Sequence, residues 1–135
     1  MIGIANLERI NKEFNRETGN QVIIDMCDYI KENLSSEYIF VRYMGPKFVI
    51  AFSGAEVDGV TRFVIDLKNA VENLDVEMVE DDKDNKKKGN KRIAKIKLNI
   101  VLTTYYKGTA LEKILKKQEE YIDNAPLTEY DVNNI

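Results

Sequence analysis

The sequence predicts an α+β fold of the ferredoxin-like or palm type, in which helices flank a mixed, mainly antiparallel central sheet. Two neighbouring runs, YIFVRY and FVIAF, are rich in the β-branched and aromatic residues typical of paired strands. Three other segments repeat apolar residues at spacings of three and four, which is typical of amphipathic helices. A later segment alternates apolar and polar residues, as a strand with one buried face does.

The first third of the chain predicts a strand, a turn and a helix. The opening segment, MIGIANL, is apolar and predicts a strand. Because a domain rarely begins inside a core strand, we expect residues 1–135 to be one domain of a longer protein. NRETGN then predicts a turn, and a helix is expected from about Gln21 to Asn33. Its apolar stripe comprises Val22, Ile23, Met26, Cys27, Ile30 and Leu34.

The stretch RYMGPKFVI, residues 42–50, predicts a β-hairpin. Gly45 tolerates a positive φ, whereas Pro46 fixes φ at about −65° and offers no amide donor, so the pair has the chemistry of a turn. SGAEVD then provides the start signals of a second helix. The apolar stripe of that helix comprises Val57, Val60, Val64, Leu67, Val71 and Leu74.

The last third predicts a strand pair and a third helix. Residues 94–102 alternate, with apolar residues at Ala94, Ile96, Leu98, Ile100 and Leu102. The segment from Glu80 to Arg92 carries many charges of both signs, and we interpret it as a solvated hairpin tip in preference to a phosphate-binding patch. Thr109 is the expected cap of the last helix and Pro126 its expected end. One face of this helix comprises Leu111, Ile114, Leu115, Gln118, Tyr121 and Ile122.

Composition excludes several classes of function. The net charge of −3 gives no electrostatic reason for nucleic-acid binding. No apolar run approaches the about 20 residues of a membrane span, so we expect no membrane contact by this domain. The chain has no histidine, which removes the commonest general base and the commonest transition-metal ligand. Its one cysteine, Cys27, excludes an intrachain disulfide, as suits the cytoplasm, and is expected to pack on a helix face.

Three segments, taken together with their spacing, resemble the GGDEF family of diguanylate cyclases. IANLERIN, then Gly19-Asn20 and then RYMGPKFVI stand where the family carries D-x-D-x-F-K-x-x-N-D, G-D and R-Y-G-G-D-E-F. LEKILKKQEEYIDNA resembles a late helix that in the family ends near Y-x-A-K. The resemblance runs from Gly3 to about Asn124. It implies an activity that condenses two GTP molecules into cyclic di-GMP across a homodimer, with magnesium ions held by carboxylates.

Carried over position by position, the resemblance implies that the metal site is lost. The first metal-binding aspartate falls on Gly3, and the next aspartate of that strand falls on Ala5. The altered signature loop comprises Met44, Gly45, Pro46, Lys47 and Phe48. Pro46 therefore replaces the second metal carboxylate, and Lys47 places a positive charge where the family keeps a negative one, which repels a magnesium ion. We expect no metal, no cofactor and no catalytic residue.

The phosphate and product-binding positions are altered as well. The family lysine that meets phosphate falls on Glu8, and the late lysine and arginine fall near Asn124 and Thr128. The inhibitory site of many members, R-x-x-D, falls on Ser35 and Tyr38. Neither residue can form the charge-assisted contacts with which Arg and Asp hold cyclic di-GMP, so we expect no inhibitory site.

The two family positions that contact guanine fall on Asn11 and Asn20. Asn20 stands where the family has an aspartate, and its single carbonyl accepts hydrogen bonds from guanine less well than a carboxylate does. For Asn20 we favour a helix N-cap or turn role over base recognition. For Asn11, a turn-end role and a remnant of base recognition have equal weight.

These observations favour a catalytically inactive GGDEF-like domain that serves as a regulatory or protein-interaction module in bacterial cyclic-dinucleotide signalling. Its partner would be another protein or other domains of the parent chain. The alternative is a non-catalytic sensor that binds a guanine nucleotide weakly through Asn11, Asn20 and Lys47, with the lysine on a phosphate. A third hypothesis keeps the fold and discards the family, as it must if the first strand does not lie beside the Met44–Lys47 turn. An active cyclase with relocated ligands is the least favoured.

Overall fold

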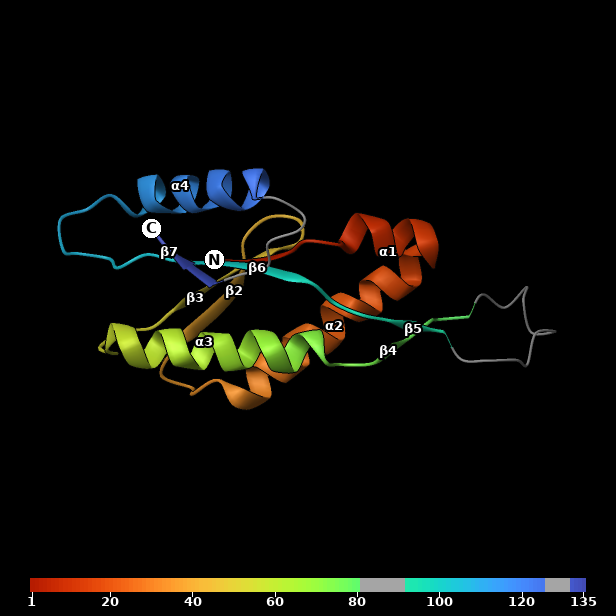
Figure 1. Ribbon diagram of the computed structural model, residues 1–135. Helices are drawn as coiled ribbons and strands as arrows, with labels where there is room; N and C mark the ends of the chain where they lie inside the picture. Colours follow the sequence, from red (N-terminus) through yellow and green to blue (C-terminus); the bar gives the residue numbers. More distant parts are fainter. Residues whose placement is uncertain (81–91, 126–131) are drawn as a thin grey trace.

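The computed structural model describes residues 1–80, 92–125 and 132–135, and Figure 1 shows the arrangement of its helices and strands. The elements in chain order are β1 (Ile2–Ile4), α1 (Leu7–Glu13), α2 (Arg16–Asn33), β2 (Ile39–Arg42), β3 (Lys47–Ala51), α3 (Val57–Glu72), β4 (Val76–Glu77), β5 (Ile93–Ala94), β6 (Leu98–Leu102), α4 (Leu111–Asn124) and β7 (Val132–Asn134).

The main sheet has five strands in the order β2-β3-β1-β6-β7. Strands β2, β3, β1 and β6 pair antiparallel with their neighbours, and only β6 and β7 pair parallel. The first strand, β1, thus lies at the centre between β3, the second strand of the hairpin, and β6, which is the ferredoxin-like arrangement. The predicted mixed, mainly antiparallel sheet is confirmed. The parallel strand β7 was not predicted, because its residues have no strand-like alternation.

Helices cover both faces of this sheet (Figure 1). The predicted stripes of α2 and α3 are confirmed, since their central residues form the larger core together with the strands. This core includes Ile2, Ile4, Val22, Met26, Ile30, Phe48, Val64, Leu67, Val71, Leu98 and Ile100. On the opposite face, α4 packs on a smaller core made of Met1, Val101 and Ile122. None of the described helices is long and apolar enough to cross a membrane.

The start of α2 corrects the predicted turn at NRETGN. Arg16 is already helical, and Asn15 is the N-cap, whose side-chain oxygen accepts hydrogen bonds from the Thr18 amide (2.8 Å) and hydroxyl (2.6 Å). Because Asn15 caps the helix, α2 begins at Arg16 and not at the predicted start near Gln21. Asn20 therefore lies within α2, and its expected N-cap or turn role is wrong. Asn11 lies within α1, a short helix that was not predicted, so its turn-end role is wrong as well.

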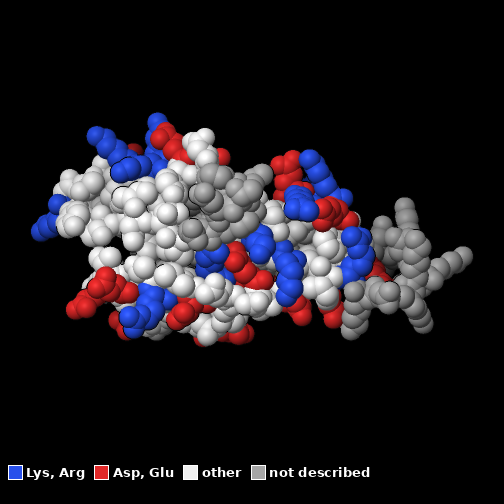
Figure 2. Space-filling view, viewed as in Figure 1, with Lys and Arg blue, Asp and Glu red and all other residues white. Residues whose placement is uncertain are grey.

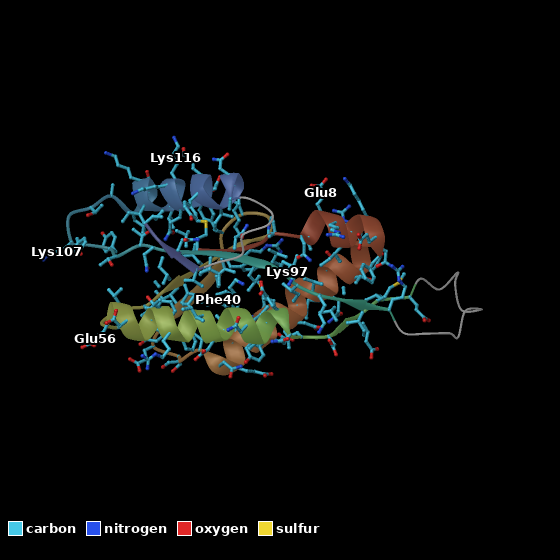
Figure 3. The ribbon with its side chains drawn as sticks, in the orientation of Figure 1. Glu8, Phe40, Glu56, Lys97, Lys107 and Lys116 are labelled. Atoms are coloured by element: carbon cyan, nitrogen blue, oxygen red, sulfur yellow. The ribbon has the colours of Figure 1, made fainter. Side chains whose placement is uncertain are left out.

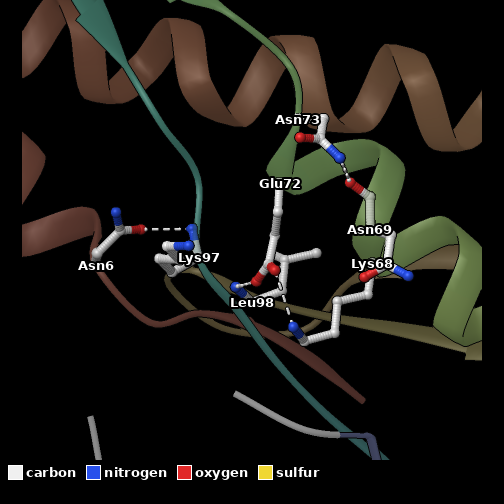
Figure 4. A network of polar contacts seen from close by, with 7 residues as sticks. All are labelled: Asn6, Lys68, Asn69, Glu72, Asn73, Lys97 and Leu98. Atoms are coloured by element: carbon white, nitrogen blue, oxygen red, sulfur yellow. Dashed lines mark hydrogen bonds and ion pairs between the residues drawn. The ribbon is translucent and has the colours of Figure 1, made fainter. Parts of the chain in front are cut away.

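The predicted strand over residues 94–102 is interrupted between β5 and β6, and side chains bridge the gap (Figure 4). The Asn6 side-chain amide donates from Nδ2 to the Lys95 carbonyl (2.8 Å), and the Lys97 backbone amide donates to the Asn6 side-chain oxygen (2.9 Å). The Leu98 amide donates to the Glu72 carboxylate (2.9 Å), which also pairs with Lys68 (2.9 Å). The chain can therefore leave the regular strand without losing hydrogen bonds.

The prediction that this strand has one buried face is confirmed over residues 94–98 and is wrong for the rest of β6. Asn99 and Val101 are buried as well, because α4 covers the second face of β6. Strands β4 and β5 pair antiparallel, but residues 81–91, which include most of the expected hairpin tip, lie outside the described residues.

Helix α4 differs from its prediction at its start and on its face. It begins after Ala110, so Thr109 is not its cap, and the expected end at Pro126 lies outside the described residues. Leu111 and Tyr121, two members of the expected face, are exposed, whereas Gln118 and Ile122 are buried.

Candidate functional site

The predicted hairpin at RYMGPKFVI is confirmed, and its turn is held by backbone and side-chain hydrogen bonds. The Tyr43 amide donates to the Lys47 carbonyl (2.9 Å), and the Lys47 amide donates to the Met44 carbonyl (3.0 Å). Gly45 has φ of +52°, a conformation that glycine adopts without a steric penalty. Its carbonyl accepts a hydrogen bond from Arg42 Nε (2.8 Å). The turn is therefore well fixed without any ligand.

This turn lies directly beside β1. Gly3 pairs with Lys47 in the antiparallel register, and the Ile4 amide donates to the Pro46 carbonyl (3.0 Å). Two segments more than forty residues apart thus meet at the positions where the family resemblance places the metal carboxylates. Had the first strand not lain beside the Met44–Lys47 turn, the family assignment would have failed. The geometry removes that reason for discarding the family.

Helix α4 fills the space above Gly3. A Cβ atom placed on Gly3 would lie 2.8 Å from Cγ2 of Ile122, closer than real Cβ contacts. Ile122 is buried, and its neighbours in the core on this face are Met1 and Val101. A larger residue at position 3 therefore requires Ile122 to move.

The charge at the turn is neutralised by the same helix. The Lys47 ammonium lies 2.6 Å from an Asp123 carboxylate oxygen, and the side chains are 16% and 50% exposed. Lys47 is thus largely covered, with its counter-charge on the last turn of α4. A site with this pair offers a divalent cation a bound ammonium where a carboxylate would be needed.

A third contact joins α4 to the turn at Tyr43. Desolvation, with the Glu119 carboxylate hydrogen-bonded to the phenol, raises the pKa of Tyr43 above its usual value. Together Glu119, Ile122 and Asp123 form what we call the α4 clamp, which contacts Tyr43, Gly3 and Lys47 in turn. Ile122 was predicted on the apolar face of this helix, whereas Glu119 and Asp123 were not singled out from the sequence, although the spacing of three and four from Glu119 to Ile122 and Asp123 places all three on one side of the helix. Of the two positions on which the family's late lysine and arginine fall, Asn124 donates from its side-chain amide to the Glu120 carbonyl of its own helix (2.8 Å), and Thr128 lies outside the described residues.

The residues at this site do not fit the magnesium ions that the family uses. Gly3, Pro46 and Lys47 supply no carboxylate, and Ala5 supplies none. Across residues 1–80, 92–125 and 132–135, no group of three or more His, Cys, Asp or Glu side chains is arranged to hold a metal ion. Hard cations need several oxygen ligands converging on one point. Pro46 and Lys47 therefore give the turn no carboxylate oxygen for such a cation.

Two of the three predicted nucleotide-binding residues lie near one another, at the contact between α1 and α2. A Cβ on Gly19 would lie 1.8 Å from the Asn11 side-chain oxygen, so the Asn11 amide rests against the backbone beside Asn20. Both asparagines are exposed. Lys47, the third predicted residue, is engaged with Asp123.

The remaining family positions make contacts within the chain itself. Glu8 points away from the body of the molecule (Figure 3) and pairs with Lys12 at 3.0 Å. At the positions of the inhibitory site, the Ser35 hydroxyl donates to Glu37 (3.3 Å), and the Tyr38 ring packs edge-on against Phe52 at 5.0 Å. Both serve the connection between α2 and β2.

Comparisons with known proteins agree with this geometry. The family model described as diguanylate cyclase, GGDEF domain, matches residues 1–129. The diguanylate cyclase SiaD of Pseudomonas aeruginosa, solved with its activator SiaC, superposes with a TM-score of 0.76 at 10% identity over 99% of this chain. This chain spans 48% of the SiaD chain, about half of its length.

Two isolated domains show the same likeness. The GGDEF domain of TpbB, or YfiN, from Pseudomonas aeruginosa gives a TM-score of 0.76 at 13% identity, covering 98% of this chain and 72% of that one. The GGDEF domain of DgcB from Caulobacter crescentus, solved with c-di-GMP, gives 0.72 at 14% identity, covering 98% and 74%. At these identities the likeness concerns the fold alone. No curated protein sequence matches.

Proposed function

Since this chain belongs to the GGDEF family of diguanylate cyclases, we propose that it is a catalytically inactive member that serves as a regulatory or protein-interaction module. One observation carries the proposal: Lys47, ion-paired with Asp123, lies beside a glycine at the position where the family holds its metal. The module would act in bacterial cyclic-dinucleotide signalling in the cytoplasm, as one domain of a longer protein.

The physical reason is the nature of the reaction. Phosphoryl-type transfer depends almost entirely on positioning and on neutralising the phosphate charge, and in this family metal ions supply much of both. Pro46 and Gly3 supply no metal ligand, and Ile122 occupies the space that a ligand at position 3 would need. Gly3 and Pro46 would thus abolish the cyclase reaction, although the sheet, its helices and the turn are intact.

A domain that keeps its fold without its chemistry can still bind a partner. SiaD was solved in complex with a protein activator, and the DgcB domain was solved with c-di-GMP. We propose a protein partner, or another domain of the parent chain, for the present domain. The positions of the inhibitory site, Ser35 and Tyr38, argue against c-di-GMP there, because neither carries a charge.

The decisive experiment is an activity assay. The purified protein is incubated with GTP and either Mg²⁺ or Mn²⁺, beside an active family member, and c-di-GMP is separated by chromatography and quantified. We expect no product above the enzyme-free control. Turnover by the wild-type chain, abolished by a chelator, would overturn the proposal.

A guanine-nucleotide sensor is a second candidate, supported by the contact of Asn11 with Gly19 beside Asn20. Titration calorimetry with GTP, GDP and c-di-GMP tests it, in the wild-type chain and in Asn20→Ala. Asn69→Ala, on the exposed face of α3, is the matched control. A sensor requires binding that Asn20→Ala weakens and Asn69→Ala leaves unchanged. The absence of heat at millimolar ligand excludes it.

A further inference from the structure

We propose that the groove between α4 and the sheet binds a small, uncharged, ring-containing molecule with a hydrogen-bond donor, and that Gln118 recognises this donor. The site is separate from the turn and from the predicted guanine positions. The inference holds whether or not the domain makes c-di-GMP, so it stands or falls independently of the proposed function.

The groove lies at the end of the sheet opposite the α4 clamp. Its volume is about 680 Å³, and its walls come from the C-terminal ends of β3 and β6, the start of α3 and the N-terminal half of α4. Val49 and Val101 belong to its floor, and Val57, Tyr105 and Leu111 are exposed residues that line it. Ligand pockets commonly enclose about 300–1,000 Å³. The groove therefore has room for a molecule of one or more rings.

The described walls of the groove carry no charged side chain. Among the described residues that line it none is Asp, Glu, Lys or Arg. The α-amino group of Met1, which also lines the groove, donates to the Val101 carbonyl (2.8 Å), and burial lowers its pKa to about 5. Lys107 and Lys116 near this end of α4 point outward in Figure 3, and Figure 2 shows a largely uncharged surface between α4 and α3 on the left of the view. An ionised ligand would lose its hydration there without a counter-charge. The chemistry thus selects against nucleotides and in favour of neutral molecules.

One polar side chain within the groove has an unused acceptor. Gln118 is only 7% exposed, lines the groove, and donates from Nε2 to the Thr103 hydroxyl (3.1 Å). Within the described residues, its Oε1 accepts no hydrogen bond. Because Gln118 lines the groove, a molecule there can donate a hydrogen bond to this oxygen. An acceptor in apolar surroundings favours a ligand with an N–H or O–H group.

The apolar rim of the groove favours a ligand that contains a ring. Val57, Tyr105 and Leu111 expose about half of their surface or more around the groove. A flat ring system that covers these side chains removes their apolar surface from water, which is favourable in proportion to the area covered. Gln118 then orients the ring, as a single polar group does in a mostly apolar pocket.

Indole and N-methylindole test the proposal, because they share a ring system and differ in one N–H donor. Binding is followed by titration calorimetry and by NMR shifts of the methyl groups of Val101 and Leu111. We expect indole to bind and N-methylindole to bind about five-fold more weakly, the effect of one hydrogen bond. Equal affinities, or binding of neither compound, would overturn the proposal.

Variants test whether Gln118 accepts the hydrogen bond from the ligand and whether the ligand binds in the groove. Gln118→Met keeps the size of the side chain, so both compounds should bind with the same affinity; Gln21→Met on α2 is the matched control and should keep the five-fold difference. If Gln118→Met does not fold, Ala51→Trp, which fills the groove from an exposed position, should abolish binding of indole. Retained binding of indole in Ala51→Trp would place the ligand elsewhere and contradict the proposal.

The same ring and donor could also come from a tryptophan side chain of a partner protein. N-acetyltryptophanamide distinguishes this source, because it adds the peptide groups that flank such a side chain. We expect it to bind no more tightly than indole. Clearly tighter binding of the amide would overturn the assignment to a small molecule.

Discussion

Lys47 and Asp123 form an ion pair with 2.6 Å between ammonium nitrogen and carboxylate oxygen, joining the turn after β2 to the last turn of α4. The family resemblance places a carboxylate on the turn and cations near the end of the late helix. In this chain the two signs are exchanged. The contact between helix and turn is kept, whereas the attraction for a metal ion is reversed.

Swapping the charges of Lys47 and Asp123 in a double variant should cost less stability than reversing the charge of Lys47 alone. Asp123→Asn should lower the free energy of unfolding by about 0.5–1 kcal/mol, because Asp123 is half exposed and solvent screens the pair. Lys47→Glu alone should destabilise more, since it places two carboxylates together. Lys47→Glu with Asp123→Lys should recover most of the loss, as measured by urea unfolding. If the double variant is less stable than Lys47→Glu, the pair is not a simple ion pair.

Gly3 and Ile122 should be energetically coupled. Gly3→Ala should lower the free energy of unfolding by about 1–3 kcal/mol, because its Cβ would meet Ile122 at 2.8 Å. Ile122→Ala alone should cost about 2–4 kcal/mol through the cavity it leaves. In the double variant the clash is absent, so the total should be smaller than the sum of the two. Additive effects in this double-mutant cycle would contradict the packing described.

Restoring the signature loop should not restore synthesis of c-di-GMP. Pro46→Asp with Lys47→Glu returns two carboxylates to the turn, but position 3 still has none. Adding Gly3→Asp brings its side chain against Ile122, so this triple variant should also be inactive. The assay is product formation from GTP with Mg²⁺, and all variants are compared with the wild-type chain. Activity in the double variant would show that Gly3 does not limit catalysis.

Glu72 should be the most sensitive position of the polar network in Figure 4. Glu72→Ala removes the acceptor of the Leu98 amide and leaves the buried Lys68 without its carboxylate, so we expect a loss of about 3 kcal/mol in the free energy of unfolding. Lys68→Met should be milder, because the Glu72 carboxylate loses its ammonium partner but still accepts a hydrogen bond from the Leu98 amide. Asp66→Ala, on the exposed face of α3, is the control. Equal effects of Glu72→Ala and Asp66→Ala in urea unfolding would contradict this role.

Tyr43 should ionise at higher pH than an ordinary tyrosine. Desolvation and the Glu119 carboxylate raise its pKa above 10.0, against an opposing effect of Lys47. A phenol with a raised pKa in the folded state contributes stability that is complete below the unfolded pKa of 10.0 and is lost as the pH rises through the folded pKa. Glu119→Gln should lower the pKa, as measured by ultraviolet titration of the phenolate with Tyr43→Phe as reference. An unchanged titration would show that Glu119 does not reach the phenol.

Periodicity explains which parts of the fold could be predicted. The stripes of α2 and α3 extend over several turns, and the hairpin combines strand-forming residues with Gly45 in the turn. Helix α1 was missed because only Ile10 is buried in its seven residues, which leaves no repeating pattern. The interruption before β6 depends on Asn6 and Glu72, which lie far from it in the sequence.

The candidate site also has parts that could be predicted from the sequence and parts that could not. The placement of the turn beside β1 followed from the resemblance, and the loss of carboxylates at Gly3 and Pro46 could be read directly from the sequence. The α4 clamp could not, because a packing contact such as that of Ile122 on Gly3 depends on how the helix crosses the sheet. The partner of Lys47 was missed for the same reason.

The bridging role of Asn6 determines how the molecule opens locally. The β4–β5 pair joins the main sheet through residues 95–97, where the Ala5 amide donates to the Lys97 carbonyl (2.8 Å) and Asn6 forms two side-chain hydrogen bonds. On the other side Asn15 and Thr18 bond to Val79, and Val76 and Ala94 are buried in the larger core. Amide protons of β4 and β5 should exchange with solvent faster than those of β1 and β6, because β4 and β5 each have two residues and only one neighbouring strand. Two rates of hydrogen exchange would then divide one polypeptide into a slowly exchanging five-stranded sheet and a short two-stranded extension, with Asn6 at the boundary.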